Sequence, residues 1–337
     1  MKRFLLMAVA ATAMLTACEK TEMVPNGDAQ EISFVAVNKT ATKVPVEGTA
    51  FQDGDNMAVA AYIVEGTTPN DFFGYTLFEK ETGATNWTGQ PARYWPLTTS
   101  KINFLAVTKT GGGVDKTTVT FNETNYASGA TVKLVGNKTY NQNDLMFAAG
   151  QGTHTQGGAY NAVPMVFKHA LAWINFNVKT TTPTDGCTIT VNSITLNSAV
   201  FKGTLTLTNN QYSATTGTVS TDNISAVWTP GNAESLKVPN AVGSDAAAAV
   251  TLNAEYQLFG NGLLVVPDGY ADSFTINYTL TQKDNTANIY DYTYDLPDGS
   301  WKMAKKYFYN INIDLTEIEV APEVDSWEAE GNPVSLK

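Results

Sequence analysis

The sequence predicts an all-β protein made of β-sandwiches, and three observations point to this class. Short runs alternate apolar and polar residues, which is the period of a strand with one buried face. Turn-forming pairs such as Asp53-Gly54 and Asp185-Gly186 separate the runs. Thr, Asn, Gly and Val are abundant, whereas long amphipathic helical patterns are scarce. Many short strands at this spacing are typical of β-sandwiches.

The strands expected from this alternation run along the whole chain. Residues 241–250 are rich in Ala and fit either a loop or a short helical turn. The expected strands are residues 32–37, 57–63, 102–107, 172–178, 189–196, 203–208, 263–266, 274–280 and 307–315.

The length of the chain suggests two domains. About 320 of its 337 residues follow the N-terminal signal described below, which is more than one small sandwich needs. A Gly-rich stretch, residues 148–163, indicates a linker before a strongly apolar run that begins at Met165. We therefore predict an N-terminal domain over residues 31–155 and a C-terminal domain over residues 156–337.

The N-terminus has the features of a lipoprotein signal. Two basic residues precede the apolar residues 4–15, a run too short to span a bilayer as a helix. Residues 15–18 read Leu-Thr-Ala-Cys, which matches the bacterial lipobox. We therefore expect a signal over residues 1–18, a lipidated Cys18 and a polar tether over residues 19–30. The alternative is an ordinary secretion signal with a chance cysteine.

Composition and motifs argue against several functional classes. The net charge is −11 and arginine occurs only at positions 3 and 93, so the sequence has no basic stripe for nucleic acid. No catalytic motif is present, and His154 and His169 lack acidic partners at metal-ligand spacing. We predict no enzyme activity, no catalytic residue, no metal and no cofactor. Two scattered carboxylates could still converge in space, which leaves a surface hydrolase as an alternative.

Two groups of aromatic residues have two interpretations. They could form a platform on which sugar rings stack, or they could fill the core and pack between strands. The first interpretation keeps open a monomeric, surface-exposed glycan-binding lipoprotein. The two groups are Trp87, Tyr94 and Trp95, and Tyr290, Tyr292 and Tyr294.

The C-terminal segment has a strand pattern of its own. Ile318, Val320 and Val324 fall on one face, with acidic residues on the other. Pro322 interrupts the pattern and suits an edge strand, because proline cannot donate to a ladder. Such a strand can pair within its own domain or with a neighbouring chain.

Several segments in a fixed order resemble the fimbrillins of Bacteroidota, the Mfa-like fimbrillin family of type V pilins. The resemblance covers nearly the whole chain. The segments that carry it are the lipobox, the strand 32–37, residues 48–55 (GTAFQDGD), residues 93–96 (RYWP) with 102–106 (INFLA), residues 167–176 (FKHALAWINF), residues 307–313 (YFYNINI) and the tail from Val324 to Trp327.

The resemblance implies two transthyretin-like antiparallel β-sandwich domains in tandem and assembly by strand exchange. In such relatives a protease removes the first strand, and the C-terminal strand of an adjacent subunit fills the groove. Here the first strand would present Ile32, Phe34 and Ala36. Known relatives are cut after an arginine, which this loop lacks, so Lys43 or Lys39 is the expected cleavage site. The expected donor strand lies within residues 316–337 and carries Ile318, Val320, Val324 and Trp327.

The resemblance also implies location and partners. The precursor would be held at the outer membrane by Cys18 and exposed at the surface, and it would then enter a fimbrium. Its partners would be other fimbrial subunits and a ligand on a host or bacterial surface. A tip role, or a lipidated anchor role without cleavage, is the alternative within the family.

Overall fold

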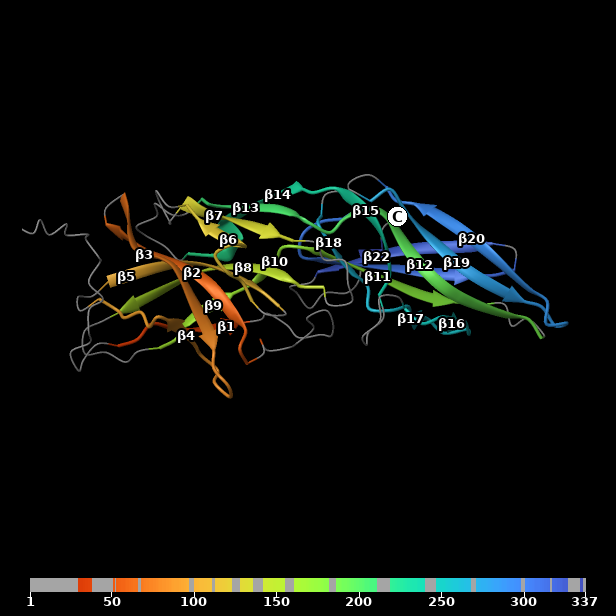
Figure 1. The fold of residues 1–337 in the computed structure, drawn as a ribbon, viewed down its shortest axis with the longest axis horizontal. Helices are drawn as coiled ribbons and strands as arrows, with labels where there is room; N and C mark the ends of the chain where they lie inside the picture. The colour runs from red at the N-terminus through yellow and green to blue at the C-terminus, as the bar shows by residue number, and fades with distance from the viewer. Residues whose placement is uncertain are drawn as a thin grey trace, which may run out of the picture.

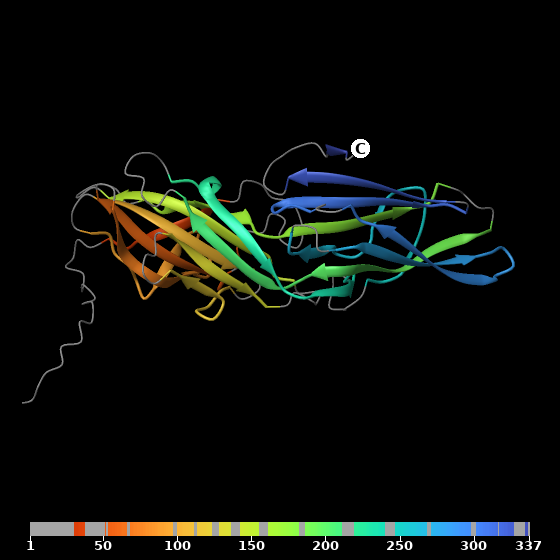
Figure 2. The ribbon, with the colours of Figure 1, turned by 90° about the horizontal axis from the view of Figure 1, so that it is seen from above.

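The computed structural model describes residues 30–37, 51, 53–65, 68–96, 100–110, 113–122, 128–135, 142–154, 161–181, 186–210, 219–239, 247–267, 271–297, 301–315, 317–326 and 334–335. The molecule is elongated, with two β-rich lobes along its long axis (Figures 1 and 2). No α-helix forms among the described residues, and a 3-10 turn, η2, spans Thr221–Asn223. The predicted all-β class is confirmed.

The first lobe contains two sheets. The larger one has the spatial order β10 (Lys168–His169), β8 (Leu145–His154), β5 (Ser100–Lys109), β2 (Asn56–Glu65), β3 (Thr68–Lys80), β4 (Trp87–Gln90), β1 (Ser33–Val37) and β9 (Val163–Val166). The smaller one has the order β14 (Ile224–Pro230), β13 (Gly203–Asn209), β7 (Gly129–Leu134) and β6 (Val119–Phe121).

The central strands β2, β5 and β8 are buried on both faces. Successive side chains of a strand point to opposite faces. Met57 and Val59 of β2 accordingly join the core that contains β1, whereas Ala58 and Ala60 join the core under the four-stranded sheet. The first lobe is therefore layered around these strands, which explains why β2 reads as a nearly continuous apolar run.

Two glycines that were expected to lie in a linker are part of β8. Gly150 and Gly152 pair with Phe104 and Ile102 of β5. A Cβ on Gly150 would lie 2.3 Å from the sulfur of Met165, and one on Gly152 would lie 2.5 Å from the Trp95 ring. The linker interpretation is wrong for residues 148–154, because these glycines allow β9 and Trp95 to pack closely against β8.

Gly152→Val is therefore expected to destabilise the first lobe. The new side chain would overlap Trp95 and Val163, and overpacking of this kind costs about 1–3 kcal/mol. Urea unfolding followed by tryptophan fluorescence measures the effect. Thr153→Val, at the exposed neighbouring position, is the matched control, and an equal loss in both variants would contradict the packing argument.

The second lobe also contains two sheets, and they enclose one apolar core. One sheet has the order β17 (Gln257–Leu258), β11 (Ala172–Lys179), β21 (Lys305–Ile313), β22 (Ile318–Ser326) and β23 (Val334–Ser335), with β18 (Leu263–Val265) also paired to β11. The other has the order β15 (Ala233–Lys237), β12 (Thr188–Val200), β19 (Ser273–Thr281) and β20 (Ala287–Asp295), with β16 (Val250–Thr251) also paired to β12. Most pairs are antiparallel, but β11 pairs with β21 and β1 with β9 in parallel.

The sheets do not divide at residues 155 and 156, where the domain boundary was predicted. Strands β9 and β10 follow this point and yet belong to the large sheet of the first lobe. Strands β13 and β14 lie farther along the chain and complete its smaller sheet through β7. The chain therefore returns to the first lobe after entering the second at β11, and a single cut does not separate the two sets of sheets.

Candidate functional site

The first strand, β1, lies inside a sheet. On one side it runs antiparallel to β4, with Ser33 opposite Thr88 and Phe34 opposite Trp87. On the other side it runs parallel to β9 over four residue pairs, from Phe34–Val163 to Val37–Val166. We call the space between β4 and β9 that β1 occupies the first-strand slot (Figure 1).

Backbone contacts extend this pairing before β1 begins. The Ile32 N–H donates to the Arg93 carbonyl oxygen at 2.6 Å. The Trp95 N–H donates to the Gln30 carbonyl oxygen at 2.9 Å, and Glu31 forms an antiparallel bridge with Tyr94. The segment after β4 thus continues the antiparallel side of the first-strand slot.

The three residues predicted to share one face of this strand do point into the core. Ile32 and Phe34 are fully buried, and Ala36 is half-buried against the same cluster. The ring centroid of Phe34 lies 4.7 Å from that of Phe78 and 4.9 Å from that of Phe104, and both contacts are edge to face. Burial of a large apolar side chain is worth roughly 1.5–3 kcal/mol, so β1 contributes substantially to the core.

The residues that follow β1 include the predicted cleavage positions. Lys39 and Lys43, like Cys18, lie outside the described residues. Phe51, farther along the chain, is buried in the same core, and its ring centroid lies 4.9 Å from that of Trp87 and 5.4 Å from that of Phe167. This downstream anchor does not depend on pairing with β1.

The turn after Phe51 adds a polar anchor. The Asp53 carboxylate accepts hydrogen bonds from the Lys80 ammonium group at 2.5 Å and from the Gly83 N–H at 3.1 Å. These hydrogen bonds, of which the one from Lys80 has the largest effect, hold the pKa of Asp53 below its usual value. Asp53-Gly54 thus forms a tight turn before β2, as the sequence suggested.

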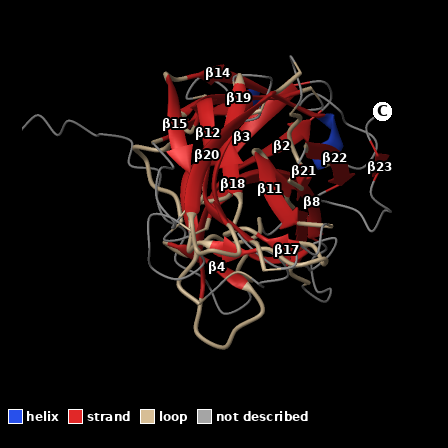
Figure 3. Cartoon of the chain, turned by 90° about the vertical axis from the view of Figure 1, so that its right-hand side faces the viewer, coloured by secondary structure: helices blue, strands red, loops and turns tan. Residues whose placement is uncertain are grey.

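The segment expected to act as donor strand is paired within its own chain in this structure. β22 runs antiparallel to β21 over nine residue pairs, from Ile313–Ile318 to Lys305–Ser326. On its other side β23 contributes two pairs (Figure 3). Ile318, Val320 and Val324 are half-buried against the core of the second lobe, and Trp327 lies outside the described residues.

Burial differs sharply between these neighbouring strands. Tyr307, Tyr309 and Ile311 of β21 are buried, and Tyr309 accepts a hydrogen bond from Trp301 Nε1 at 2.9 Å. By contrast, none of the described side chains of β22 is fully buried. β22 is therefore held mainly by its ladder and by a partly buried apolar face.

The aromatic groups do not form a common exposed platform. Trp87 and Trp95 are buried in the first lobe. Tyr292 and Tyr294 pack on the core of the second lobe, whereas Tyr290 is exposed and stacks on Tyr278 at 5.5 Å. Core filling is thus the main role of these aromatic side chains.

The described residues contain no group of three or more His, Cys, Asp or Glu side chains that could hold a metal ion. His154 stacks on Trp95. His169 Nδ1 lies 2.6 Å from the buried Asp144 carboxylate, a pair that sequence spacing did not reveal. No helix in the described part of the chain is long and apolar enough to cross a membrane.

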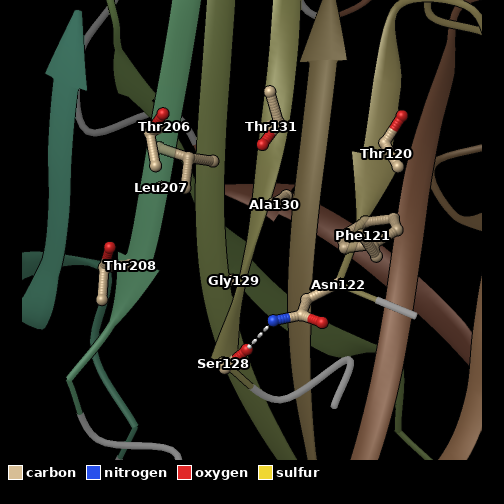
Figure 4. Close-up of a pocket in the computed structure, with 10 residues that line it drawn as sticks. All are labelled: Thr120, Phe121, Asn122, Ser128, Gly129, Ala130, Thr131, Thr206, Leu207 and Thr208. Carbon is tan, nitrogen blue, oxygen red and sulfur yellow. Dashed lines mark hydrogen bonds between the residues drawn. The ribbon is translucent and has the colours of Figure 1, made fainter. Parts of the chain in front are cut away.

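A surface hollow of about 620 Å³ lies over β6, β7 and β13 (Figure 4). Asn122 Nδ2 donates to Ser128 Oγ at 2.9 Å on one side of it. Its lining has no ionisable side chain and so offers no acid–base group. The lining residues are Thr120, Phe121, Asn122, Ser128, Gly129, Ala130, Thr131, Thr206, Leu207 and Thr208.

One family model and several solved structures match this chain. A family model described as fimbrillin-like matches residues 42–327. A fimbrial protein from Bacteroides vulgatus is 17% identical, with a TM-score of 0.51 over 88% of this chain and 99% of that chain. A fimbrial assembly protein from Parabacteroides distasonis is 12% identical, with a TM-score of 0.46 over 91% and 98%. Curated protein sequences gave no match.

Proposed function

The chain belongs to the fimbrillin-like family, and we propose that it is a structural subunit of a cell-surface fimbria that assembles by strand exchange. Proteolysis between β1 and Phe51 would release residues up to Lys43 or Lys39. The C-terminal segment of an adjacent subunit would then fill the first-strand slot. The fimbria would support adhesion to a host or bacterial surface.

The position of β1 is the observation that carries this proposal. β1 is covalently joined to the rest of the lobe only through the residues that contain Lys39 and Lys43. It nevertheless lies between two strands, and Phe34 of β1 and the preceding Ile32 belong to the core. One cut after β1 therefore turns an internal strand into a removable one, while Phe51 and the Asp53–Lys80 pair hold the new N-terminal end.

The energies of the two strands are compatible with exchange. Loss of Ile32 and Phe34 from the core would cost several kcal/mol, at roughly 1.5–3 kcal/mol for each large apolar side chain. A strand that brings Ile318 and Val320 to the same positions would bury similar groups. The incoming strand would also restore hydrogen bonds to the edges of β4 and β9, whose buried backbone groups need partners.

Lipidation of Cys18 fits the same scheme. A lipid on Cys18 would hold the precursor at the outer membrane, since dual or triple acylation gives stable anchoring. Cleavage after Lys43 would remove the lipid together with β1. In a subunit that escaped cleavage the lipid would stay, and the protein would act as an anchor.

The cleavage site can be tested directly. Treatment of the purified precursor with a lysine-specific protease is expected to give SDS-resistant ladders whose subunits begin at Val44. Lys39→Gln/Lys43→Gln should abolish both the cut and the ladders, whereas Lys283→Gln, at an exposed position far from β1, should change neither. Subunits that polymerise while retaining residues 32–37 would contradict the proposal, and N-terminal sequencing distinguishes the outcomes.

A further inference from the structure

The two edges of the first-strand slot differ, and this difference defines the strand that fits. The β4 edge makes an antiparallel pair with β1, with perpendicular hydrogen bonds. The β9 edge makes a parallel pair, with slanted and evenly spaced bonds. A strand that ran the opposite way would exchange these two patterns.

Both edges are held in place by their other neighbours. β4 is paired to β3 over four residues, from Leu77–Gln90 to Lys80–Trp87. β9 packs on β8 where Gly150 and Gly152 leave room for Met165 and Val163. Side chains in a strand also lean along its direction, so a side chain placed between Phe78 and Phe104 would lean the other way on a reversed strand.

The β4 edge also sets the register of a strand that contains a proline. The Ile32 N–H points to the β4 side, towards the Arg93 carbonyl oxygen. Backbone N–H groups alternate along a strand, so those at positions 34 and 36 point to the same side. The ladder with β4 ends at the Phe34–Trp87 pair, because β4 begins at Trp87. A residue in place of Ala36 thus needs no N–H for β4, whereas a proline in place of Phe34 would lose a ladder bond.

We propose that the first-strand slot accepts β22 of a second copy of this chain in the β1 direction, with Ile318, Val320 and Pro322 at the positions of Ile32, Phe34 and Ala36. This inference rests on the proposed function. The register puts Pro322 where the slot lacks a β4 partner. It also points Glu319 and Ala321 outwards, at the positions of the half-buried Ser33 and Val35.

The register predicts one specific cross-link. Ser33 faces Thr88 in the precursor, so Glu319 of the incoming strand should face Thr88. Directly opposed residues have Cα atoms about 4.5–5.5 Å apart, which a disulfide can bridge. In a Cys187→Ser background, polymers of Thr88→Cys/Glu319→Cys are expected to become boiling-resistant under oxidation and to separate again in reductant.

Matched variants separate the outcomes. Thr88→Cys/Ala321→Cys is expected to give at least tenfold less cross-linked polymer. Preferential cross-linking through position 321 would overturn the register, because it requires a two-residue shift or a reversed strand. If neither pair cross-links in polymers that form normally, the inference fails. If no polymer forms even without the cysteine substitutions, the proposed function itself fails.

Two peptides test the direction separately, without any change to the protein. After cleavage, a labelled peptide with the sequence of residues 30–38 should displace the cut β1. A second peptide has the same residues in reverse order, so in the slot it can match either the order of the side chains or the direction of the backbone, but not both. This second peptide should bind at least tenfold more weakly. Equal binding of both peptides would overturn the directional part of the inference.

Discussion

A disulfide between β21 and β22 is expected to block assembly completely. Phe308 and Glu323 face each other across the two strands on the outer face of the sheet. Their Cα atoms should lie within the range that a disulfide spans. The oxidised Phe308→Cys/Glu323→Cys precursor, in a Cys187→Ser background, should be cleaved normally and yet form no ladder. Reduction should restore the ladder, because β22 could then leave β21.

A second engineered disulfide, between β19 and β20, provides the control. Thr275 and Thr293 face each other on β19 and β20, with their hydroxyl oxygens 3.0 Å apart. These strands are not expected to move, so Thr275→Cys/Thr293→Cys should polymerise whether oxidised or reduced. If the oxidised Phe308→Cys/Glu323→Cys protein still polymerises, β22 does not leave its sheet during assembly. The donor must then lie after Ser326.

Phe34→Ala is expected to cause the largest loss of stability at the first-strand slot. The side chain is fully buried between Phe78 and Phe104, and truncation of a buried phenylalanine costs about 3–5 kcal/mol. The first unfolding transition of the uncleaved precursor in urea should shift to lower concentration, as Trp87 and Trp95 fluorescence would report. After cleavage, the cut strand should leave faster than in the unchanged protein.

Val35→Ala is the matched control for this substitution. Val35 is half-buried on the opposite face of the same strand and loses fewer contacts on truncation. A change below about 1 kcal/mol is expected for such a site. If Phe34→Ala were equally mild, β1 would contribute little to the core, and its removal would not create a demand for a donor strand.

The alternating pattern predicted strands well where one or both faces are apolar. The expected strands at residues 102–107, 172–178 and 274–280 correspond to β5, β11 and β19. The pattern missed β3, which spans thirteen residues, because Pro69, Asn70, Asp71 and Gly74 interrupt its alternation. Pairing with β2 across two register shifts accommodates these residues. Such irregularities depend on both strands and cannot be inferred from the sequence of one strand.

The Gly-rich stretch shows the opposite kind of error. Glycine is depleted in strands, so Gly150 and Gly152 indicated a linker. They lie in β8 because other segments, β9 and Trp95, need the space that side chains would fill. A requirement set by residues distant in the chain cannot be inferred from local propensity.

The all-β class, the family resemblance and the inward face of β1 were predictable without a structure, because local alternation and motif order are properties of the chain alone. Only the folded structure shows that β1 lies between an antiparallel and a parallel neighbour and that β22 is paired to β21. The fold also shows that strands from beyond residue 156 complete the first lobe. The physical reason is that strand pairing joins distant segments through backbone groups that every residue carries, so the choice of partner depends on how whole faces pack.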